Sequence, residues 1–219
     1  MNIGFLDGRH IVFVSGIDTG VGKTFVTGEM ARMAMDEGRD VTTVKMVQTG
    51  NIGCSEDIEL HRKIMGVGEL PEDREGLTAP QIFAFPGSGL LAARLEGRRV
   101  NLGRITRSVE ECANRRDLVL VESAGGLSVP LTSSKLTVDY LAETGWPLVL
   151  VTNGRLGSIN HTLMSIEVAK KRGIEIIAVV YDWSPDVDPV IDADTPRTIR
   201  SYLRRWGIKA AFTTMPYHG

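Results

Sequence analysis

Residues 16–24 read Gly-Ile-Asp-Thr-Gly-Val-Gly-Lys-Thr, which resembles the pattern G-x-x-x-x-G-K-[ST] with five residues instead of four between Gly16 and Gly22. Glycines at these spacings let the backbone bend, so that its N–H groups point inward at phosphate oxygens. In this pattern Lys23 brings positive charge to the β- and γ-phosphates, and the Thr24 hydroxyl reaches Mg²⁺. The motif follows the apolar run 11–15 and opens the helix-like stretch 23–36. The sequence therefore predicts a phosphate-binding loop between a strand and a helix.

Short apolar runs recur on both sides of this loop. Each is four to eight residues long and apolar on both faces, which is typical of strands buried in a parallel sheet. They are Ile11–Ser15, Val41–Val47, Leu118–Val121, Leu148–Thr152 and Ile174–Tyr181. Helix-like stretches lie between them, at Lys23–Asp36, Leu102–Arg115, Ser158–Lys171 and Thr195–Trp206. This alternation predicts an α/β fold with a doubly wound, mostly parallel sheet, helices on both faces and three layers.

The length of 219 residues favours one domain spanning residues 1–219. Ligands of doubly wound sheets bind at the carboxyl ends of the strands. Residues 69–89 carry three prolines and little periodicity. We interpret this segment as a long surface excursion near a binding site, with a passive insertion as the alternative.

The composition excludes several classes of partner. Lys and Arg number 25 against 27 Asp and Glu, and the net charge of −2 argues against nucleic acid or an anionic membrane as a partner. No apolar run approaches the roughly 18 residues of a membrane span, and the first residues do not resemble a signal peptide. Cys54 and Cys112 lack metal-site spacing. We therefore expect a cytoplasmic protein.

A second lysine leaves the second predicted strand at its carboxyl end, in the run Lys45-Met46-Val47-Gln48-Thr49-Gly50. Beside a phosphate loop, a second cation would stabilise the charge that develops during phosphoryl transfer. The alternative is a lysine that extends to solvent at the sheet edge. Thr49 offers a hydroxyl to a substrate.

Two carboxylates are candidate Mg²⁺ ligands. Glu122 ends the apolar run 118–121, which is the position of the second acidic motif of phosphate-loop enzymes, and Gly125 and Gly126 then allow a ligand to approach the backbone. Asp57 follows Ser55 at the start of a helix-like stretch. It is either a metal ligand or a favourable charge in the first turn of a helix capped by Ser55.

The run 153–161, Asn-Gly-Arg-Leu-Gly-Ser-Ile-Asn-His, follows another buried strand and places a second helix N-terminus at the same sheet edge. Such a terminus is either an anion site or an ordinary capped turn. His161 alone is no more than a capping or core histidine.

Four of these motifs, over residues 10–185, resemble those of dethiobiotin synthetases, a family of the P-loop NTPase superfamily. Residues 16–24 resemble G-T-D-T-x-V-G-K-T, and residues 45–50 are similar to K-P-V-x-[ST]-G. Residues 122–126 look like E-G-A-G-G, and residues 155–161 resemble K-L-G-x-I-N-H. The four motifs occur in the family's order and spacing.

The resemblance implies a Mg²⁺-dependent reaction of ATP, CO₂ and 7,8-diaminopelargonic acid that gives dethiobiotin, ADP and phosphate. It implies a homodimer, with the substrate tail reaching the partner near residues 157–160. The implied catalytic residues are Lys23, Lys45 and Thr19, and the implied metal ligands are Thr24, Asp57 and Glu122. The implied substrate contacts are Thr19, Thr49, Gly157, Ser158 and Asn160. The implied nucleotide contacts are Gly20, Val21, Gly22, Lys23, Thr24, Phe25, Asp57, Glu122, Gly125, Tyr181, Asp182 and Pro216.

The chain departs from the family pattern at several places, among them Met46 for Pro and Arg155 for Lys. Tyr181 stands before Asp182 where the family often has Asn to read adenine, so we expect a stacking contact from Tyr181 and relaxed base choice. Residues 86–90, Pro-Gly-Ser-Gly-Leu, lack the second Pro and the His of the family's P-x-S-P-H segment. Two other functions share the fold, namely a partition-type ATPase switch and a relative that binds nucleotide without turnover. Asp18 stands where partition ATPases carry a signature lysine, which counts against the first.

Overall fold

A computed structural model of the chain describes residues 2–184 and 186–215. Six strands form one sheet in the order β2-β5-β1-β6-β7-β8, and every neighbouring pair is parallel. The strands are β1 Ile11–Gly16, β2 Val41–Lys45, β5 Leu118–Gly126, β6 Leu148–Asn153, β7 Ile176–Asp182 and β8 Ala211–Met215. The predicted doubly wound α/β fold is confirmed.

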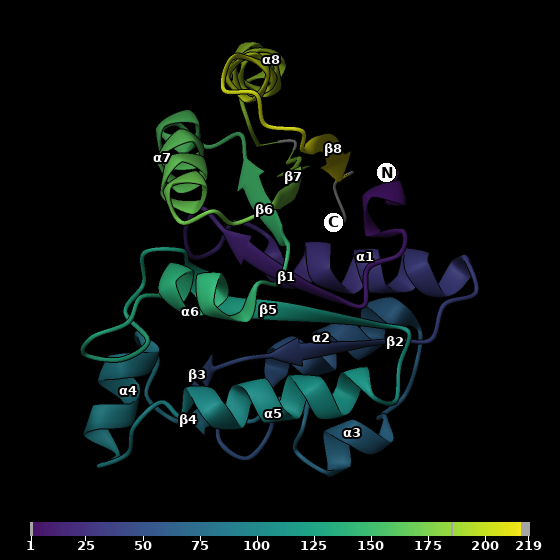
Figure 1. The fold of residues 1–219 in the computed structure, drawn as a ribbon, viewed down its shortest axis with the longest axis vertical. Helices are drawn as coiled ribbons and strands as arrows, with labels where there is room; N and C mark the ends of the chain where they lie inside the picture. The colour runs from purple at the N-terminus through teal and green to yellow at the C-terminus, as the bar shows by residue number, and fades with distance from the viewer. Residues whose placement is uncertain (1, 185, 216–219) are drawn as a thin grey trace.

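Helices cover both faces of this sheet (Figure 1), with α5 and α6 on the near face and α1 and α2 on the far face. The long helices are α1 Lys23–Asp36, α2 Glu56–Met65, α5 Leu102–Ala113, α6 Thr137–Thr144, α7 Ser158–Lys171 and α8 Pro189–Arg205. α7 packs on β6 and β7, and α8 packs on α7. None of the described helices combines the length and the apolar character that a membrane span needs.

The strand order reverses around β1. The chain runs from β1 out to β2, returns to β5, and then continues on the other side of β1 with β6. In sheets of this kind, ligands bind in the crevice outside the carboxyl ends of the strands at such a reversal. The loop from Ile17 to Gly22 occupies this position, between β1 and α1.

Local sequence explains where the site helices begin. Ser55 precedes α2, and its Oγ accepts a hydrogen bond from the backbone N–H of Ile58, so the predicted N-cap is confirmed. Gly66 ends the same helix in the left-handed conformation at φ 71°. These caps fix the start and the length of α2, which carries Asp57.

The end of segment 69–89 lines a cavity beside the phosphate loop, as expected, but the segment is not a surface excursion throughout. It contains the short helix α3 (Pro71–Arg74), and the two-residue strand β4 (Ile82–Phe83) pairs in parallel with β3 (Gln48–Thr49). Glu72 and Phe83 are buried. Glu72 accepts two hydrogen bonds from Arg116, so a distant arginine holds the segment against the body of the protein.

Several element boundaries also differ from the predictions. The second strand ends at Lys45 rather than Val47, because the chain then turns into β3. The strand that carries Glu122 continues to Gly126, so this carboxylate lies within β5 and not at its end. The last helix begins at Pro189, where Asp188 caps it, rather than at residue 195. β8 was not predicted.

Candidate active site

The phosphate loop depends on glycines at two positions. Gly20 and Gly22 have φ values of 70° and 88°, which L side chains rarely adopt. At Gly22 a Cβ atom would also overlap the carboxylate of Asp182. The end of β7 therefore packs directly against the loop, and glycine at position 22 makes this approach possible.

Lys23, the lysine of the loop, is 7% exposed, and its Nζ donates a hydrogen bond to the carbonyl oxygen of Asp18 at 2.8 Å. Burial, and then the positive charge of Lys45, lower the pKa of Lys23 to about 8. A phosphate group would offer this ammonium the counter-charge that its surroundings only partly supply.

Lys45 forms the centre of a buried ionic cluster. Its Nζ lies 2.6 Å from Asp57 Oδ2 and 2.6 Å from Glu122 Oε1. Burial alone would lower the pKa of Lys45, but the two carboxylates raise it. The alternative of a lysine that extends to solvent is wrong, since Lys45 is only 6% exposed.

Glu122 is fully buried and receives bonds from three elements. Thr24 Oγ1 on α1 lies 3.0 Å from Oε1, Lys45 on β2 contacts the same oxygen, and His61 Nε2 on α2 lies 2.9 Å from Oε2. Burial alone would raise the pKa of Glu122, but Lys45 and His61 hold it well below its usual range. The carboxylate is therefore ionised at neutral pH.

All three predicted metal ligands, Thr24, Asp57 and Glu122, lie in this cluster. Thr24 Oγ1 lies within hydrogen-bond distance of both Glu122 and Asp57, at 3.0 and 3.2 Å. Hydroxyl and carboxylate oxygens suit Mg²⁺, which is usually bound by one or two carboxylates together with substrate phosphates and water. Within the described residues, no group of three His, Cys, Asp or Glu side chains forms a complete metal cage. The donor set fits a cation that arrives with a nucleotide.

His61 was not identified from the sequence. It is fully buried, and its Nδ1 lies 2.9 Å from Thr43 Oγ1 while its Nε2 faces Glu122. Thr43 Oγ1 accepts from Arg62, so its own proton is available to His61 Nδ1, and Nε2 then donates to Glu122. The signal in the sequence was the spacing of four residues from Asp57, which places both side chains on one face of α2.

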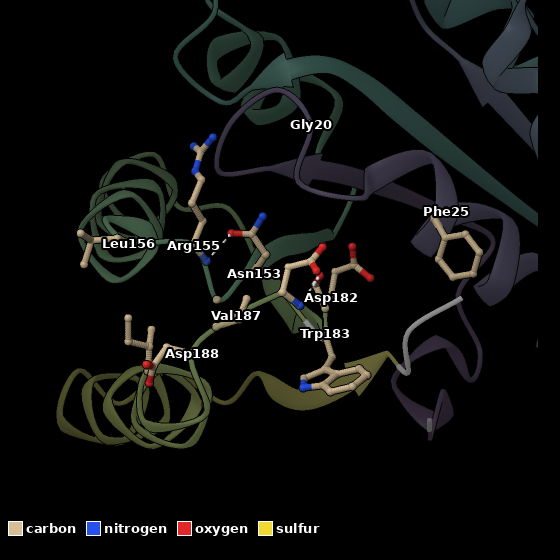
Figure 2. A pocket seen from close by; sticks show the side chains of 13 residues that line it. Gly20, Phe25, Asn153, Arg155, Leu156, Asp182, Trp183, Val187 and Asp188 are labelled. Atoms are coloured by element: carbon tan, nitrogen blue, oxygen red, sulfur yellow. Dashed lines mark hydrogen bonds between the residues drawn. The ribbon is translucent and has the colours of Figure 1, made fainter. Parts of the chain in front are cut away.

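Two cavities meet at the phosphate loop and share Gly20 and Phe25. One, of about 860 Å³, contains the ionic cluster and is also lined by Thr19, Thr49, Gly125 and residues 86–89. The other, of about 660 Å³, lies beside the ends of β6 and β7 and is lined by Phe25, Asp182 and Trp183 (Figure 2). The two cavities adjoin at the phosphate loop, and together they are called the trough.

Some predicted residues lie elsewhere. The side chain of Val21 is buried in the core, so only its backbone is available to a ligand. Gly157, Ser158 and Asn160 line neither cavity, and the Ser158 hydroxyl donates to Asn153 Oδ1 at 2.7 Å. Pro216 lies outside the described residues.

The expected stacking contact from Tyr181 is wrong. Tyr181 is 1% exposed, and its hydroxyl donates to Asp192 on α8 at 2.7 Å. A ring enclosed in this way presents no face to a nucleobase. Asp182, the next residue, does line the second cavity, and burial raises its pKa to about 6.

Comparison with known proteins places the chain in a family. A family model described as an AAA domain matches residues 10–206. ATP-dependent dethiobiotin synthetase BioD 2 of Pasteurella multocida is 42% identical over 94% of this chain and 96% of its own length. ATP-dependent dethiobiotin synthetase BioD of Chlorobaculum tepidum is 46% identical over 92% and 84%. BioD 2 of Haemophilus influenzae is 45% identical over 81% and 93%. With these identities over nearly its whole length, the chain belongs to the family of ATP-dependent dethiobiotin synthetases.

Proposed function

We propose that this chain converts 7,8-diaminopelargonic acid, CO₂ and ATP into dethiobiotin, ADP and phosphate. The observation that carries the proposal is the position of Lys45. Its ammonium lies 2.6 Å from two carboxylates at the wall of the cavity into which Lys23 and Thr24 of the phosphate loop also project. Membership of the synthetase family supports the same assignment.

The chemistry needs positioning and charge stabilisation rather than an enzyme nucleophile. One amine of the substrate forms a carbamate with CO₂. A carbamate oxygen then attacks the γ-phosphorus, and the bond to the β-phosphate oxygen breaks to release ADP. The second amine attacks the carbonyl carbon of the mixed anhydride, and inorganic phosphate leaves as the ring closes. Two negatively charged groups must therefore meet in the phosphoryl-transfer step.

Lys23 and Lys45 neutralise this charge in the proposed mechanism. Lys23 contacts the β- and γ-phosphates from the loop, and Lys45 moves from Asp57 and Glu122 toward the transferring phosphoryl and carbamate oxygens. Lys45 is the group that balances the two carboxylates in the structure described here. Asp57 and Glu122 would hold a divalent cation when ATP is bound, and its charge would then balance theirs in place of Lys45.

Thr24, Asp57 and Glu122 would hold Mg²⁺, which supplies charge neutralisation at the β- and γ-phosphates when bound. Their oxygens already gather around one point. Thr19 and Thr49 would contact the diamine or its carbamate, since both line the larger cavity. Gly125, with φ 77°, lets the backbone of β5 approach the same space.

We also propose that two copies of the chain associate through the α7 N-terminal region. Leu156 is 86% exposed and Met164 57% exposed, and association with a second copy would remove this apolar surface from water. Gly157 and Asn160 lie between them and would reach the tail of a substrate bound to the partner. Analytical ultracentrifugation of the wild type and of Leu156→Glu tests this, and a monomeric wild type would contradict it.

The free thiols of Cys54 and Cys112 support a reducing compartment, the cytoplasm, as the place of the reaction.

The decisive experiment supplies diaminopelargonate, bicarbonate, Mg²⁺ and ATP, and measures dethiobiotin by mass and phosphate release in parallel. The proposal requires one phosphate for each dethiobiotin, with no product when any substrate is omitted. Phosphate release without dethiobiotin would instead favour the ATPase switch. Binding of ATP without either product would favour the relative that lacks turnover.

A further inference from the structure

One carboxylate on α8 joins two side chains from the end of β7. Asp192 Oδ1 accepts a hydrogen bond from the Tyr181 hydroxyl at 2.7 Å, and Oδ2 accepts one from Trp183 Nε1 at 2.9 Å. Tyr181 and Trp183 are two residues apart, so extended backbone directs both side chains to the same side. Each oxygen of Asp192 thus fixes one aromatic ring.

Tyr181 fills the space beneath the cavity beside β6 and β7. A Cβ atom at Gly154 would overlap its hydroxyl, and Gly154 itself lines that cavity. The hydroxyl is engaged by Asp192, and the ring is buried. Position 181 therefore supports the cavity floor from below and cannot contact a ligand inside it.

Trp183 does line the cavity, together with Phe25 of α1 and Asp182 (Figure 2). Its contacts to described residues include a hydrogen bond from the indole N–H to Asp192 and one from the backbone N–H to the carbonyl of Met215 at the end of β8. The indole is thus an ordered aromatic surface at the side of the trough opposite the ionic cluster.

The position of this cavity identifies the part of the ligand that it would take. The cavity adjoins the larger one at Gly20 of the phosphate loop and Phe25 of α1, and neither Lys45 nor Glu122 lines it. A nucleoside triphosphate whose γ-phosphate lies at Lys23 and Lys45 must extend its base in the opposite direction. The base then reaches the Trp183 side of the trough.

We propose that Trp183 is the stacking surface for the nucleobase, and that Asp192 is the positioning residue that fixes the indole in place. This inference rests on the proposed use of ATP. Stacking on an aromatic side chain does not depend on the identity of the base, because every base presents a π-face. Trp183 therefore strengthens the binding of adenine, cytosine and guanine nucleotides by similar factors.

The first test measures ADP binding by calorimetry for the wild type, Trp183→Phe and Trp183→Ala. Trp183→Ala is expected to weaken ADP about 10- to 100-fold, and Trp183→Phe only a few-fold, because phenylalanine keeps an aromatic face. The affinity of Trp183→Ala for CDP and for GDP should fall by a similar factor. Inorganic triphosphate, which has no base, should bind the wild type and Trp183→Ala equally. In turnover, KM for ATP should rise while kcat stays within about two-fold.

A double-mutant cycle separates positioning from a general loss of structure. Asp192→Ala should lower the affinity for ADP, but by less than Trp183→Ala does. The double variant should bind ADP as tightly as Trp183→Ala alone. ADP should quench tryptophan fluorescence in the wild type. Trp183→Phe should abolish this quench, whereas Trp206→Phe, at the far end of α8, should keep it.

The outcomes distinguish this inference from the proposed function. If the wild type binds no ADP, the proposed use of ATP fails. If the wild type binds ADP and Trp183→Ala binds it within two-fold, the function stands and the stacking role is wrong. A parallel loss of ADP and triphosphate affinity in Trp183→Ala would assign Trp183 to the scaffold of the loop instead.

Discussion

His61 Nε2 lies 2.9 Å from Glu122 Oε2, and neither side chain reaches solvent. The contact connects α2 to β5 beneath the candidate metal ligands. A histidine that bonds a ligating carboxylate fixes the orientation of that carboxylate. With Thr43 on its other nitrogen, His61 holds the plane of Glu122 so that Oε1 faces Lys45 and Thr24.

His61→Ala should therefore destabilise the protein as well as the site. The substitution leaves Glu122 Oε2, which is buried, without its hydrogen-bond donor. This loss should lower the unfolding free energy by about 2–4 kcal/mol. Urea unfolding followed by circular dichroism measures the loss. His61→Gln, which keeps an N–H donor, should recover part of it. His10→Ala, at an exposed histidine, is the control and should change the unfolding free energy by less than about 0.5 kcal/mol.

The phosphate loop and the ionic cluster could be predicted because contiguous motifs carry them. Each of Lys23, Lys45 and Glu122 belongs to a motif that ends or follows a recognisable apolar run, and parallel strands bring their carboxyl ends to one edge of the sheet. His61 and Trp183 were missed because their roles arise from contacts between elements. His61 becomes significant only when α2 packs beside β5. The Tyr181 prediction failed for the same reason, since its burial depends on Asp192 of a later helix.

Lys45→Ala should reduce kcat by about three orders of magnitude or more, because the ammonium acts on charge that develops in the transition state. ADP affinity should change far less, since Lys23 and the loop backbone remain. Single-turnover rates with ATP and calorimetric ADP binding separate the two effects. Lys63→Ala, an exposed lysine on α2, is the matched control and should keep the wild-type rate. Wild-type rates in Lys45→Ala would remove this residue from the site.

Mg²⁺ binding should depend on the nucleotide. Without a nucleotide, the ammonium of Lys45 already neutralises Asp57 and Glu122. Calorimetry with Mg²⁺ and the protein alone should therefore detect only weak binding. With ADP present the affinity should rise. Asp57→Asn removes one charged ligand and should raise the Mg²⁺ concentration for half-maximal rate about 10- to 100-fold. Strong Mg²⁺ binding to the protein alone would show that Lys45 does not compete with the cation.

Nucleotide affinity should fall as the pH rises above about 8. In the free protein, burial and Lys45 lower the pKa of Lys23 to about 8, so this side chain loses its proton as the pH passes through that value. Phosphate oxygens favour the charged form and raise the pKa in the complex. Binding therefore takes up a proton above pH 8, and the ADP dissociation constant should rise by up to about ten-fold per pH unit until the pKa of the complex is reached.

Calorimetry between pH 7 and 9.5, in buffers of different ionisation enthalpy, measures both the affinity and the proton uptake. Lys23→Arg keeps its charge over this range, so its affinity, even if lower, should not change with pH. An equal pH dependence in the wild type and in Lys23→Arg would assign the titration to another group.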